Sequence, residues 1–477
     1  MATSMRTRDR SEAFLTEGRP WRQALLIDVG STFTKIMVID AEGRVLARAE
    51  SPTTIDRDVM EGVERAIAAL PDELRGPYDW SLASSSAAGG LRMASVGLTA
   101  ALSGRAGSLA AFGAGAKVVA NEQGFLDDAA IGRIEATSPH LVLLAGGLDG
   151  GNSEALVHNA QALAGLATPH GFVVAGNASA AGEAAGLLRG GARDVRVVEN
   201  VFPRAGEIAI TGTRDAVRDL FLKHITRAKG LDGLMETFKT ECEPTPLAVS
   251  RALAHLPGGG GPVVFVDLGG ATTDVHSLGG VREEHRVVEI PEPEVMRSVE
   301  GDLGMRWGAP GTVEAMAASR RAAAEARLGS DLAAEARRRR DTPSFLPADD
   351  HDRAVDRELA EAAVATAVER HAGKVVVRHR PWGDRYQVTG KDLRQTRLVV
   401  ATGGAFRHGR DPRDLVQRAL ESIEGAQSPR HPAISIDTSY ALYATGLIAR
   451  LSPGLARQLA RSALADASAE TMEAQAS

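Results

Sequence analysis

The chain has 477 residues, of which 44% are hydrophobic and 24% are charged, the balance of an ordinary folded protein of about two to four domains. Its formal net charge of −6 gives no basic footprint for nucleic acid or for an anionic membrane surface. The single cysteine, Cys242, excludes an intrachain disulfide framework and fits a reducing compartment. No apolar run approaches the roughly 18 residues of a membrane span. We therefore expect a cytoplasmic protein that binds neither nucleic acid nor membrane.

After a polar tail at 1–22, two apolar runs at 24–27 and 36–39 predict two strands joined by a polar turn. Glycine lets backbone N–H groups approach phosphate oxygens, hydroxyls can donate to them, and a carboxylate can hold Mg²⁺ through water. We therefore predict that Asp28 is a metal ligand. The predicted phosphate-binding residues are Gly30, Ser31, Thr32, Thr34 and Lys35, with Lys35 ranked lower because its side chain could point to solvent from the second strand.

The next segments predict a third strand at 44–50, a helix at 58–70 and a strand that begins at Trp80. This β-β-β-α-β order is that of the first half of a ribonuclease H-like lobe. From about 100 to 205, helical segments alternate with apolar runs at 117–120, 141–144, 172–175 and 195–198, which predicts a parallel α/β insertion. Its glycine-rich segment 145–152 is either a second ligand or partner loop or a plain strand-to-helix turn.

A second hairpin follows helical segments within 213–256 and the breaker run Pro257-Gly258-Gly259-Gly260-Gly261. Asp267 follows Asp28 by 239 residues and again ends a buried apolar run, which indicates an internal structural repeat. We predict Asp267 as the catalytic residue that orients water and as a metal ligand, with Asp274 as a further metal ligand. The predicted phosphate-binding residues are Gly269, Gly270, Thr272 and Thr273. Further strands are expected at 275–278 and 284–288.

The C-terminal part begins with a charged helix at 312–340 that ends in Arg337-Arg338-Arg339-Arg340, read as a solvated face. A loop at 341–355, a helix at 356–371 and a buried strand at 398–402 follow. The strand runs into Gly403 and Gly404, which we predict to lie beneath the adenine and ribose of a nucleotide. A final helix is expected at 437–452, whose small residues Ala441, Ala444 and Gly446 would let it cross the helix at 246–256 closely. The chain beyond 465 is expected to be a flexible tail.

One Asp-x-Gly turn alone is weak evidence, since these residues populate ordinary turns. Two such turns in order, each after a buried strand, favour a nucleotide-binding protein. We therefore predict an α/β fold of two ribonuclease H-like (actin-like ATPase) lobes, at 23–257 and 258–465, with a nucleotide cleft between them. The α/β insertion belongs to the first lobe, and the expected cofactors are ATP or ADP and Mg²⁺.

These motifs resemble those of the actin, Hsp70 and sugar-kinase ATPase superfamily. A closer resemblance is to the glutamate mutase L family, also called MutL and unrelated to mismatch repair. It is carried by the segments 27–35, Ala83-Ser84-Ser85-Ser86-Ala87-Ala88-Gly89-Gly90-Leu91-Arg92-Met93 and 143–152. The resemblance implies an accessory protein that uses ATP to reactivate an adenosylcobalamin-dependent mutase, with the mutase subunits as partners. Within the last segment, Leu148 stands where Thr is expected.

Three other functions stay open from the sequence. A small-molecule kinase needs an extra carboxylate base, for which Asp149 is the suggestive candidate. A filament-forming or structural protein of the actin type needs a polymerisation surface. A hydantoinase-type hydrolase would carry the same Asp-x-Gly turn.

Overall fold

In the computed structural model, the described residues divide into two compact units. The first unit takes the described residues up to Val249 and Leu447–Leu455, and the second takes those from Ser250 to Gly446 and from Ala456 on. None of the described helices is both long and apolar enough to cross a membrane. The described residues are 20–30, 33–54, 57–86, 91–99, 116–169, 171–190, 193–205, 207, 209–224, 230–257, 261–280, 294–378 and 385–474.

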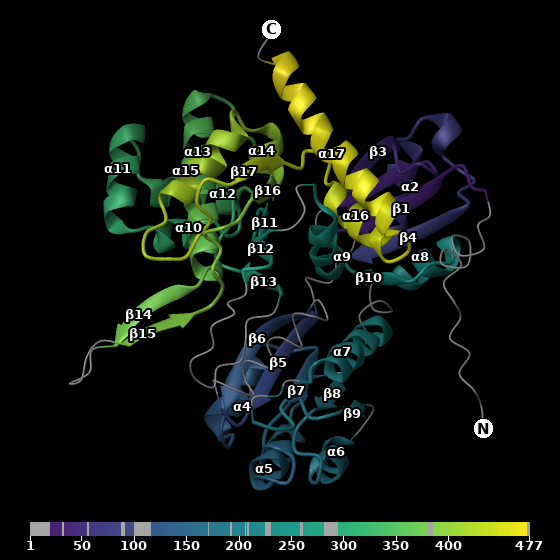
Figure 1. Cartoon of the computed structure of the whole chain (residues 1–477), viewed down its shortest axis with the longest axis vertical. Helices are drawn as coiled ribbons and strands as arrows, with labels where there is room; N and C mark the ends of the chain where they lie inside the picture. Colours follow the sequence, from purple (N-terminus) through teal and green to yellow (C-terminus); the bar gives the residue numbers. More distant parts are fainter. Residues whose placement is uncertain are drawn as a thin grey trace. The chain divides into compact units, whose positions relative to one another are not determined.

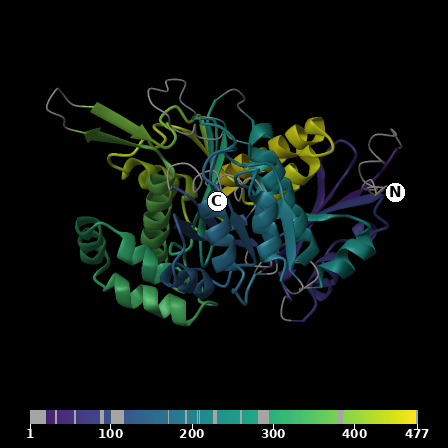
Figure 2. The same ribbon diagram turned by 90° about the horizontal axis from the view of Figure 1, so that it is seen from below.

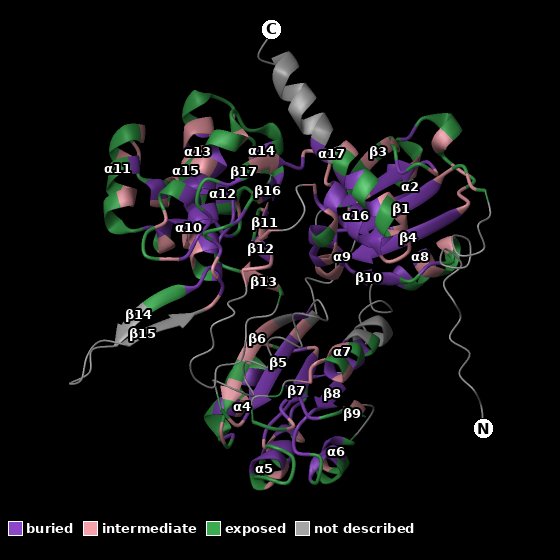
Figure 3. Ribbon diagram, viewed as in Figure 1, coloured by how far each residue is buried: buried purple, intermediate pink, exposed green. Residues whose placement is uncertain are grey.

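The first unit contains a five-stranded mixed sheet of order β10-β4-β1-β2-β3. β1 pairs antiparallel with β2 and parallel with β4, so β1 lies at the centre and its six residues are all buried (Figure 3). Helices α2 and α8 cover one face, where alternate residues of β1 and β2 form a core with Val63 and Leu234. The bounds are β1 Ala24–Val29, β2 Phe33–Ile39, β3 Val45–Pro52, α2 Val59–Ala68, β4 Trp80–Ser85, α8 Leu231–Phe238 and β10 Cys242–Pro244. The predicted strands 24–28, 34–40 and 44–50 and helix 58–70 are confirmed, whereas β10 was not predicted.

A second sheet of this unit is inserted between β4 and α8. Its five strands all run parallel in the order β6-β5-β7-β8-β9 (Figure 1). Helices α4, α5 and α6 pack on one face and α7 on the other, which is the doubly wound arrangement of α/β domains. The predicted parallel insertion is confirmed, and it begins at β5, earlier than residue 100. The bounds are β5 Leu91–Gly97, β6 Ala116–Gln123, α4 Asp128–Ala136, β7 Leu141–Leu144, α5 Glu154–Leu163, β8 Gly171–Val174, α6 Ala181–Leu188, β9 Asp194–Val197 and α7 Thr211–His224.

The second unit is built on a five-stranded sheet of order β13-β12-β11-β16-β17. Its core lies between this sheet and a helical layer dominated by α13 and α15. A two-stranded hairpin, β14 and β15, projects from the rest of the unit (Figures 1 and 2). The strand bounds are β11 Val263–Leu268, β12 Thr273–Leu278, β13 Val295–Glu300, β14 Lys374–Arg378, β15 Arg385–Thr389, β16 Leu398–Thr402 and β17 Ala433–Ile436.

The remaining helices are α9 Thr245–Ala252, α10 Ala309–Ala315, α11 Ala318–Leu328, α12 Leu332–Asp341, α13 Asp350–His371, α14 Gly404–His408, α15 Pro412–Glu421, α16 Ala441–Ala449 and α17 Pro453–Ala474. The segment expected to be a single helix at 312–340 forms three helices. The backbone is extended at Met316, which ends α10, and Gly329 ends α11 in the left-handed region at φ 67°. The segment after 465, expected to be a tail, is helical as far as Ala474, since α17 continues through this alanine-rich segment.

The two mixed sheets have the same strand order and the same directions. β1, β2, β3, β4 and β10 correspond to β11, β12, β13, β16 and β17, with antiparallel pairs at the hairpin and parallel pairs beyond the central strand. In each unit a helix from the connection between the third and fourth strands, α2 or α13, packs beside the helix that precedes the fifth strand, α8 or α15. The predicted internal repeat of ribonuclease H-like lobes is confirmed.

Two further predictions concern the strand at 284–288 and the N-terminal tail. The strand expected at 284–288 lies outside the described residues, and the third strand of the second sheet is β13. The predicted tail at 1–22 ends earlier in the structure, because Asp79 accepts hydrogen bonds from the backbone N–H groups of Arg22 and Gln23 at 2.7 and 3.2 Å. Trp21 also packs edge-on against Trp80, with ring centroids 4.9 Å apart.

Candidate functional site

The two Asp-x-Gly turns are closed by the same backbone hydrogen bond. The Gly30 N–H donates to the Phe33 carbonyl at 3.0 Å, and the Gly269 N–H donates to the Thr272 carbonyl at 2.9 Å. A Cβ on Gly30 would lie 2.5 Å from the Phe33 carbonyl oxygen, so no side chain fits at this position. Of the predicted phosphate ligands in the first turn, Ser31 and Thr32 lie outside the described residues.

Asp28 is buried at the end of β1, on the sheet face opposite the α2 core. Its Oδ1 accepts two hydrogen bonds, from Ser84 Oγ at 2.8 Å and from Thr245 Oγ1 at 2.5 Å. Lys35 is its cross-strand partner in the β1–β2 register. Burial raises the pKa of Asp28, while the charge of Lys35 and the two hydroxyl hydrogen bonds act in the opposite direction. The charge of the Lys35 ammonium thus favours the ionised form of Asp28, the predicted metal-binding carboxylate.

The second turn presents backbone N–H groups on one side because its carbonyls are held on the other. Met305 N donates to the Gly269 carbonyl at 3.0 Å, and Arg306 N donates to the Gly270 carbonyl at 2.7 Å. In a trans peptide the C=O and N–H bonds point in opposite directions. The N–H groups of Gly270 and Ala271 are therefore directed away from the 305–308 segment, and both residues are exposed. Such a pair of N–H groups can bind an anion.

Asp267 and Asp274 face each other across the β11–β12 pair, so two carboxylates lie side by side where the first sheet has Asp28 and Lys35. Arg297 binds one of them, with Nη2 2.8 Å from Asp274 Oδ2. Asp274 Oδ1 is buried and has no hydrogen-bond partner among the described residues.

An unsatisfied carboxylate oxygen beside a second carboxylate fits a hard cation such as Mg²⁺. Within the described residues no group of three or more His, Cys, Asp or Glu could enclose a metal. Two carboxylates leave most positions around a cation to water, which suits Mg²⁺.

Gly403 lies against the second turn. β16 pairs with β11, placing Thr402 opposite Asp267, and a Cβ on Gly403 would lie 2.2 Å from the Leu268 carbonyl oxygen. Its φ of 125° also favours glycine. Gly404 differs, since it is exposed and a Cβ there would meet no atom within 4 Å. The predicted adenosine-binding glycines thus comprise one fixed by packing and one beside open space.

A buried carboxylate, Asp437, holds the first residues of the small-residue helix α16 and was not predicted as a functional residue. It accepts hydrogen bonds from the backbone N–H groups of Ala441 and Leu442 at 3.0 and 3.2 Å. Burial raises its pKa, and these hydrogen bonds lower it. Arg251 Nη1 donates to the Gly446 carbonyl at 2.8 Å, while the close helix crossing expected from Ala441, Ala444 and Gly446 stays a prediction.

Two predicted hydroxyl ligands are used within the fold. Thr34 is buried and shares a 3.1 Å hydrogen bond with Thr53, and Thr273 Oγ1 donates to the Leu303 carbonyl at 3.0 Å. Thr272 is half-buried at the turn and supplies the carbonyl that closes it.

The glycine-rich segment 145–152 joins β7 to α5, and asparagines that follow neighbouring strands hold it. Asn177 Nδ2 donates to the Gly151 carbonyl at 3.1 Å, and Asn200 Nδ2 donates to the Gly147 carbonyl at 2.9 Å. Asp149 Oδ1 accepts from Asn200 Nδ2 and from Ala178 N, each at 2.9 Å. Asp149, the suggested kinase base, therefore helps to fix this turn.

Several residues that build the site were missed because they come from distant strands and helices. Ser84 lies within a motif already noted, but only strand pairing shows that it reaches Asp28. Thr245 is 217 residues from Asp28 in sequence, and Arg297 lies on a strand that was not predicted. Alternation along β13 could have suggested that Arg297 faces the Asp274 side of the sheet.

Two repeated lobes, each with an Asp-x-Gly turn at the end of its central strand, define an actin-like ATPase fold. The chain belongs to the MutL protein family, whose model matches residues 24–464. It is 35% identical over 444 residues to Protein MutL of Clostridium tetanomorphum, an alignment that covers 90% of this chain and 96% of that protein.

Among solved structures, nucleotide-free acetone carboxylase is similar with a TM-score of 0.44 and 13% identity, over 90% of this chain and 70% of that one. The nucleotide-free diol dehydratase-reactivating factor is similar with a TM-score of 0.36 and 10% identity, over 90% of this chain and 99% of that one.

Proposed function

We propose that the protein binds Mg²⁺-ATP through its two glycine turns, hydrolyses it, and uses the cycle to reactivate an adenosylcobalamin-dependent mutase such as glutamate mutase. The observation that carries the nucleotide part is the recurrence of one turn, with the same closing hydrogen bond, at the end of the central strand of both sheets.

In this proposal the N–H groups of Gly270 and Ala271 bind phosphate oxygens, and the Gly30 turn binds phosphate with Lys35. Asp267 and Asp274 hold Mg²⁺ in the second unit, and Asp28 holds it through water in the first. The cation would neutralise phosphate charge. Asp267 also orients the attacking water by accepting a hydrogen bond from it.

The adenosine would lie on Gly403 and Gly404. Gly404 supports this placement because the space beside it is open.

The proposal of a mutase as the partner is supported by family membership, since the alignment with the MutL relative covers 90% of this chain. A mutase that loses its adenosyl group keeps a tightly bound, inactive cofactor. An ATPase that takes different conformations with ATP and ADP can drive release of such a cofactor, provided that the two conformations bind the mutase differently. Reactivation of a mutase needs only ATP hydrolysis and no transfer of the phosphate to a small molecule.

The test combines the purified protein with Mg²⁺-ATP and a glutamate mutase inactivated by hydroxocobalamin. We expect ATP-dependent recovery of mutase turnover and release of phosphate. The Asp267→Ala variant should abolish both while the far-ultraviolet circular dichroism spectrum stays unchanged. Asp274→Ala is the matched variant, expected to raise the Mg²⁺ concentration needed for hydrolysis rather than abolish it.

Transfer of phosphate to a small molecule, with no effect on the mutase, would refute the reactivation role and favour a kinase. Near-normal hydrolysis by Asp267→Ala would remove this residue from the mechanism.

A further inference from the structure

We infer that Arg306 is a positioning residue, which fixes the phosphate-binding turn of the second unit by anchoring it to a buried ion-pair network. This inference rests on the proposed function, because it takes the Gly269–Thr272 turn as a nucleotide contact. Arg306 was not identified from the sequence, and no residue of the network it joins belongs to the predicted site.

The backbone of Arg306 contacts the turn directly. Its N–H donates to the Gly270 carbonyl at 2.7 Å, while Met305 N and Gly308 N add hydrogen bonds of 3.0 and 3.3 Å to the carbonyls of Gly269 and Gly270. A Cβ on Gly270 would lie 3.5 Å from Arg306 Cβ, so the arginine stem packs against this glycine. The direction of the turn peptides therefore depends on where the Arg306 backbone lies.

The side chain of Arg306 is anchored at its other end by three donors. Nη1 donates to the Met305 carbonyl at 2.7 Å, Nε to the Phe345 carbonyl at 3.1 Å, and Nη2 to Asp356 Oδ2 at 3.2 Å. The side chains of Arg306 and Asp356 are each only 16% exposed, so this ion pair is shielded from water. Asp356 belongs to α13, the long helix that packs against the sheet.

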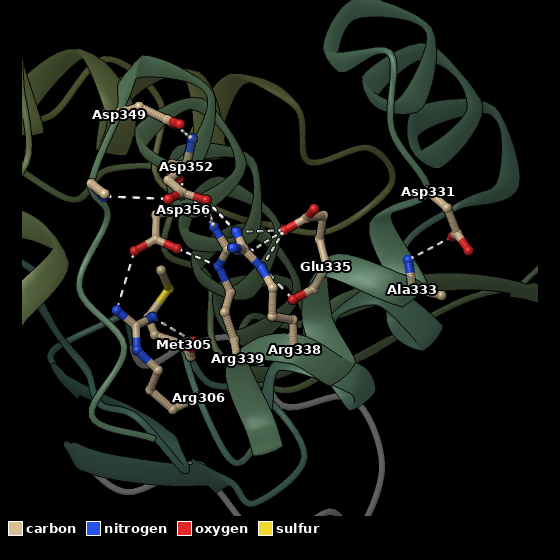
Figure 4. A network of polar contacts seen from close by, with 11 residues as sticks. Met305, Arg306, Asp331, Ala333, Glu335, Arg338, Arg339, Asp349, Asp352 and Asp356 are labelled. Atoms are coloured by element: carbon tan, nitrogen blue, oxygen red, sulfur yellow. Dashed lines mark hydrogen bonds and ion pairs between the residues drawn. The ribbon is translucent and has the colours of Figure 1, made fainter. Parts of the chain in front are cut away.

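Asp356 connects Arg306 to a second buried guanidinium (Figure 4). Its Oδ1 is 2.5 Å from Nε of Arg339, whose side chain is fully buried and also binds Glu335 at 2.7 Å. The prediction that Arg337–Arg340 form a solvated face is therefore wrong for Arg339. The guanidinium groups of Arg306, Arg338 and Arg339 all lie over the Phe345 ring, at 5.7, 4.6 and 4.9 Å from its centroid.

A turn with two adjacent glycines has little rigidity of its own, because glycine has access to the most backbone conformations. Here the rigidity comes from outside the turn, through Arg306. Arg338 offers a matched comparison, since it stacks on the same ring and binds Asp352 and Glu335. The hydrogen bonds described for Arg338 do not reach the turn.

The experiment measures ATP and AMP affinity by isothermal titration for the wild-type protein, Arg306→Met, Arg306→Lys and Arg338→Met. Loss of the charged hydrogen bonds should weaken ATP binding by Arg306→Met about tenfold. AMP should bind as to wild type, because it lacks the phosphates that this turn would contact. Arg306→Lys keeps the charge opposite Asp356 and should lie between the two. Arg338→Met should bind both nucleotides normally.

The outcomes separate the two levels of the proposal. If the wild-type protein binds no ATP, the proposed function fails. If the wild-type protein binds ATP, and both Arg306→Met and Arg306→Lys bind ATP as tightly as the wild type does, only the positioning role is overturned. An equal loss of ATP and AMP affinity in Arg306→Lys would also overturn it, since that pattern reports a general structural defect.

Discussion

The adjacent glycines Gly403 and Gly404 offer a sharp test, since an alanine should destabilise the sheet at the first position and not at the second. In Gly403→Ala the new Cβ meets the Leu268 carbonyl oxygen at 2.2 Å. Alanine must also adopt φ 125°. Backbone strain of about 1–3 kcal/mol and overpacking of about 1–3 kcal/mol together predict a loss of about 2–6 kcal/mol in local stability. In Gly404→Ala nothing obstructs the methyl group, so stability should be unchanged or slightly higher.

Because a chain with several domains does not unfold in one transition, the assay should be local. Hydrogen exchange of the amides of β11 and β16, followed by mass spectrometry, reports the opening of this part of the sheet. Gly403→Ala should exchange much faster than wild type, and Gly404→Ala should exchange at the wild-type rate. Equal exchange in the two variants would refute the packing argument. Gly404→Ala should in addition weaken ATP binding, since its methyl group enters the space proposed for the nucleotide.

Three other predictions concern single side chains. Burial lowers the pKa of His371 from 6.5 to about 3, so the unfolded state binds a proton at a higher pH than the folded state does. The second unit should therefore lose stability as pH falls below about 6.5, and His371→Gln should reduce that loss in acid-unfolding curves. Trp307 is 62% exposed and next to Arg306, so ATP should change its fluorescence; persistence of the full change in Trp307→Phe would contradict this. Thr245→Val removes a 2.5 Å hydrogen bond to Asp28, which should raise the pKa of Asp28 and move the acid limb of ATP binding to higher pH, while Thr245→Ser should bind as wild type.

The hairpins and their repeat could be predicted because they depend on local information. An apolar run, an acid and a glycine within a few residues are enough to indicate a strand that ends in a tight turn. The insertion was also recognisable from alternating strands and helices. Its start was placed too late because Leu91–Gly97 continues directly from the motif that follows β4, and nothing local separates the two strands.

The environment of the site could not be predicted, because it depends on strand register and helix packing. Thr245 reaches Asp28 only because β10 pairs beside β4. The charged sequence around Arg339 is typical of a solvated helix face, yet its side chain is fully buried and forms ion pairs with acidic residues of α12 and α13. A run of four arginines reads the same whether its members face water or one of them is buried.

The place of the inserted sheet has a consequence for how such proteins can change over evolutionary time. β4 and β10 are adjacent strands, paired from Ala83 with Cys242 to Ser85 with Pro244, although a whole five-stranded sheet lies between them in sequence. In the second unit the equivalent strands β16 and β17 are connected through α14 and α15 alone. The register of the first sheet is therefore independent of the insert. Such a domain can be replaced or remodelled among descendants of one ancestor without disturbing the carboxylate of Asp28, so the insert and the proposed nucleotide site are free to diverge at different speeds.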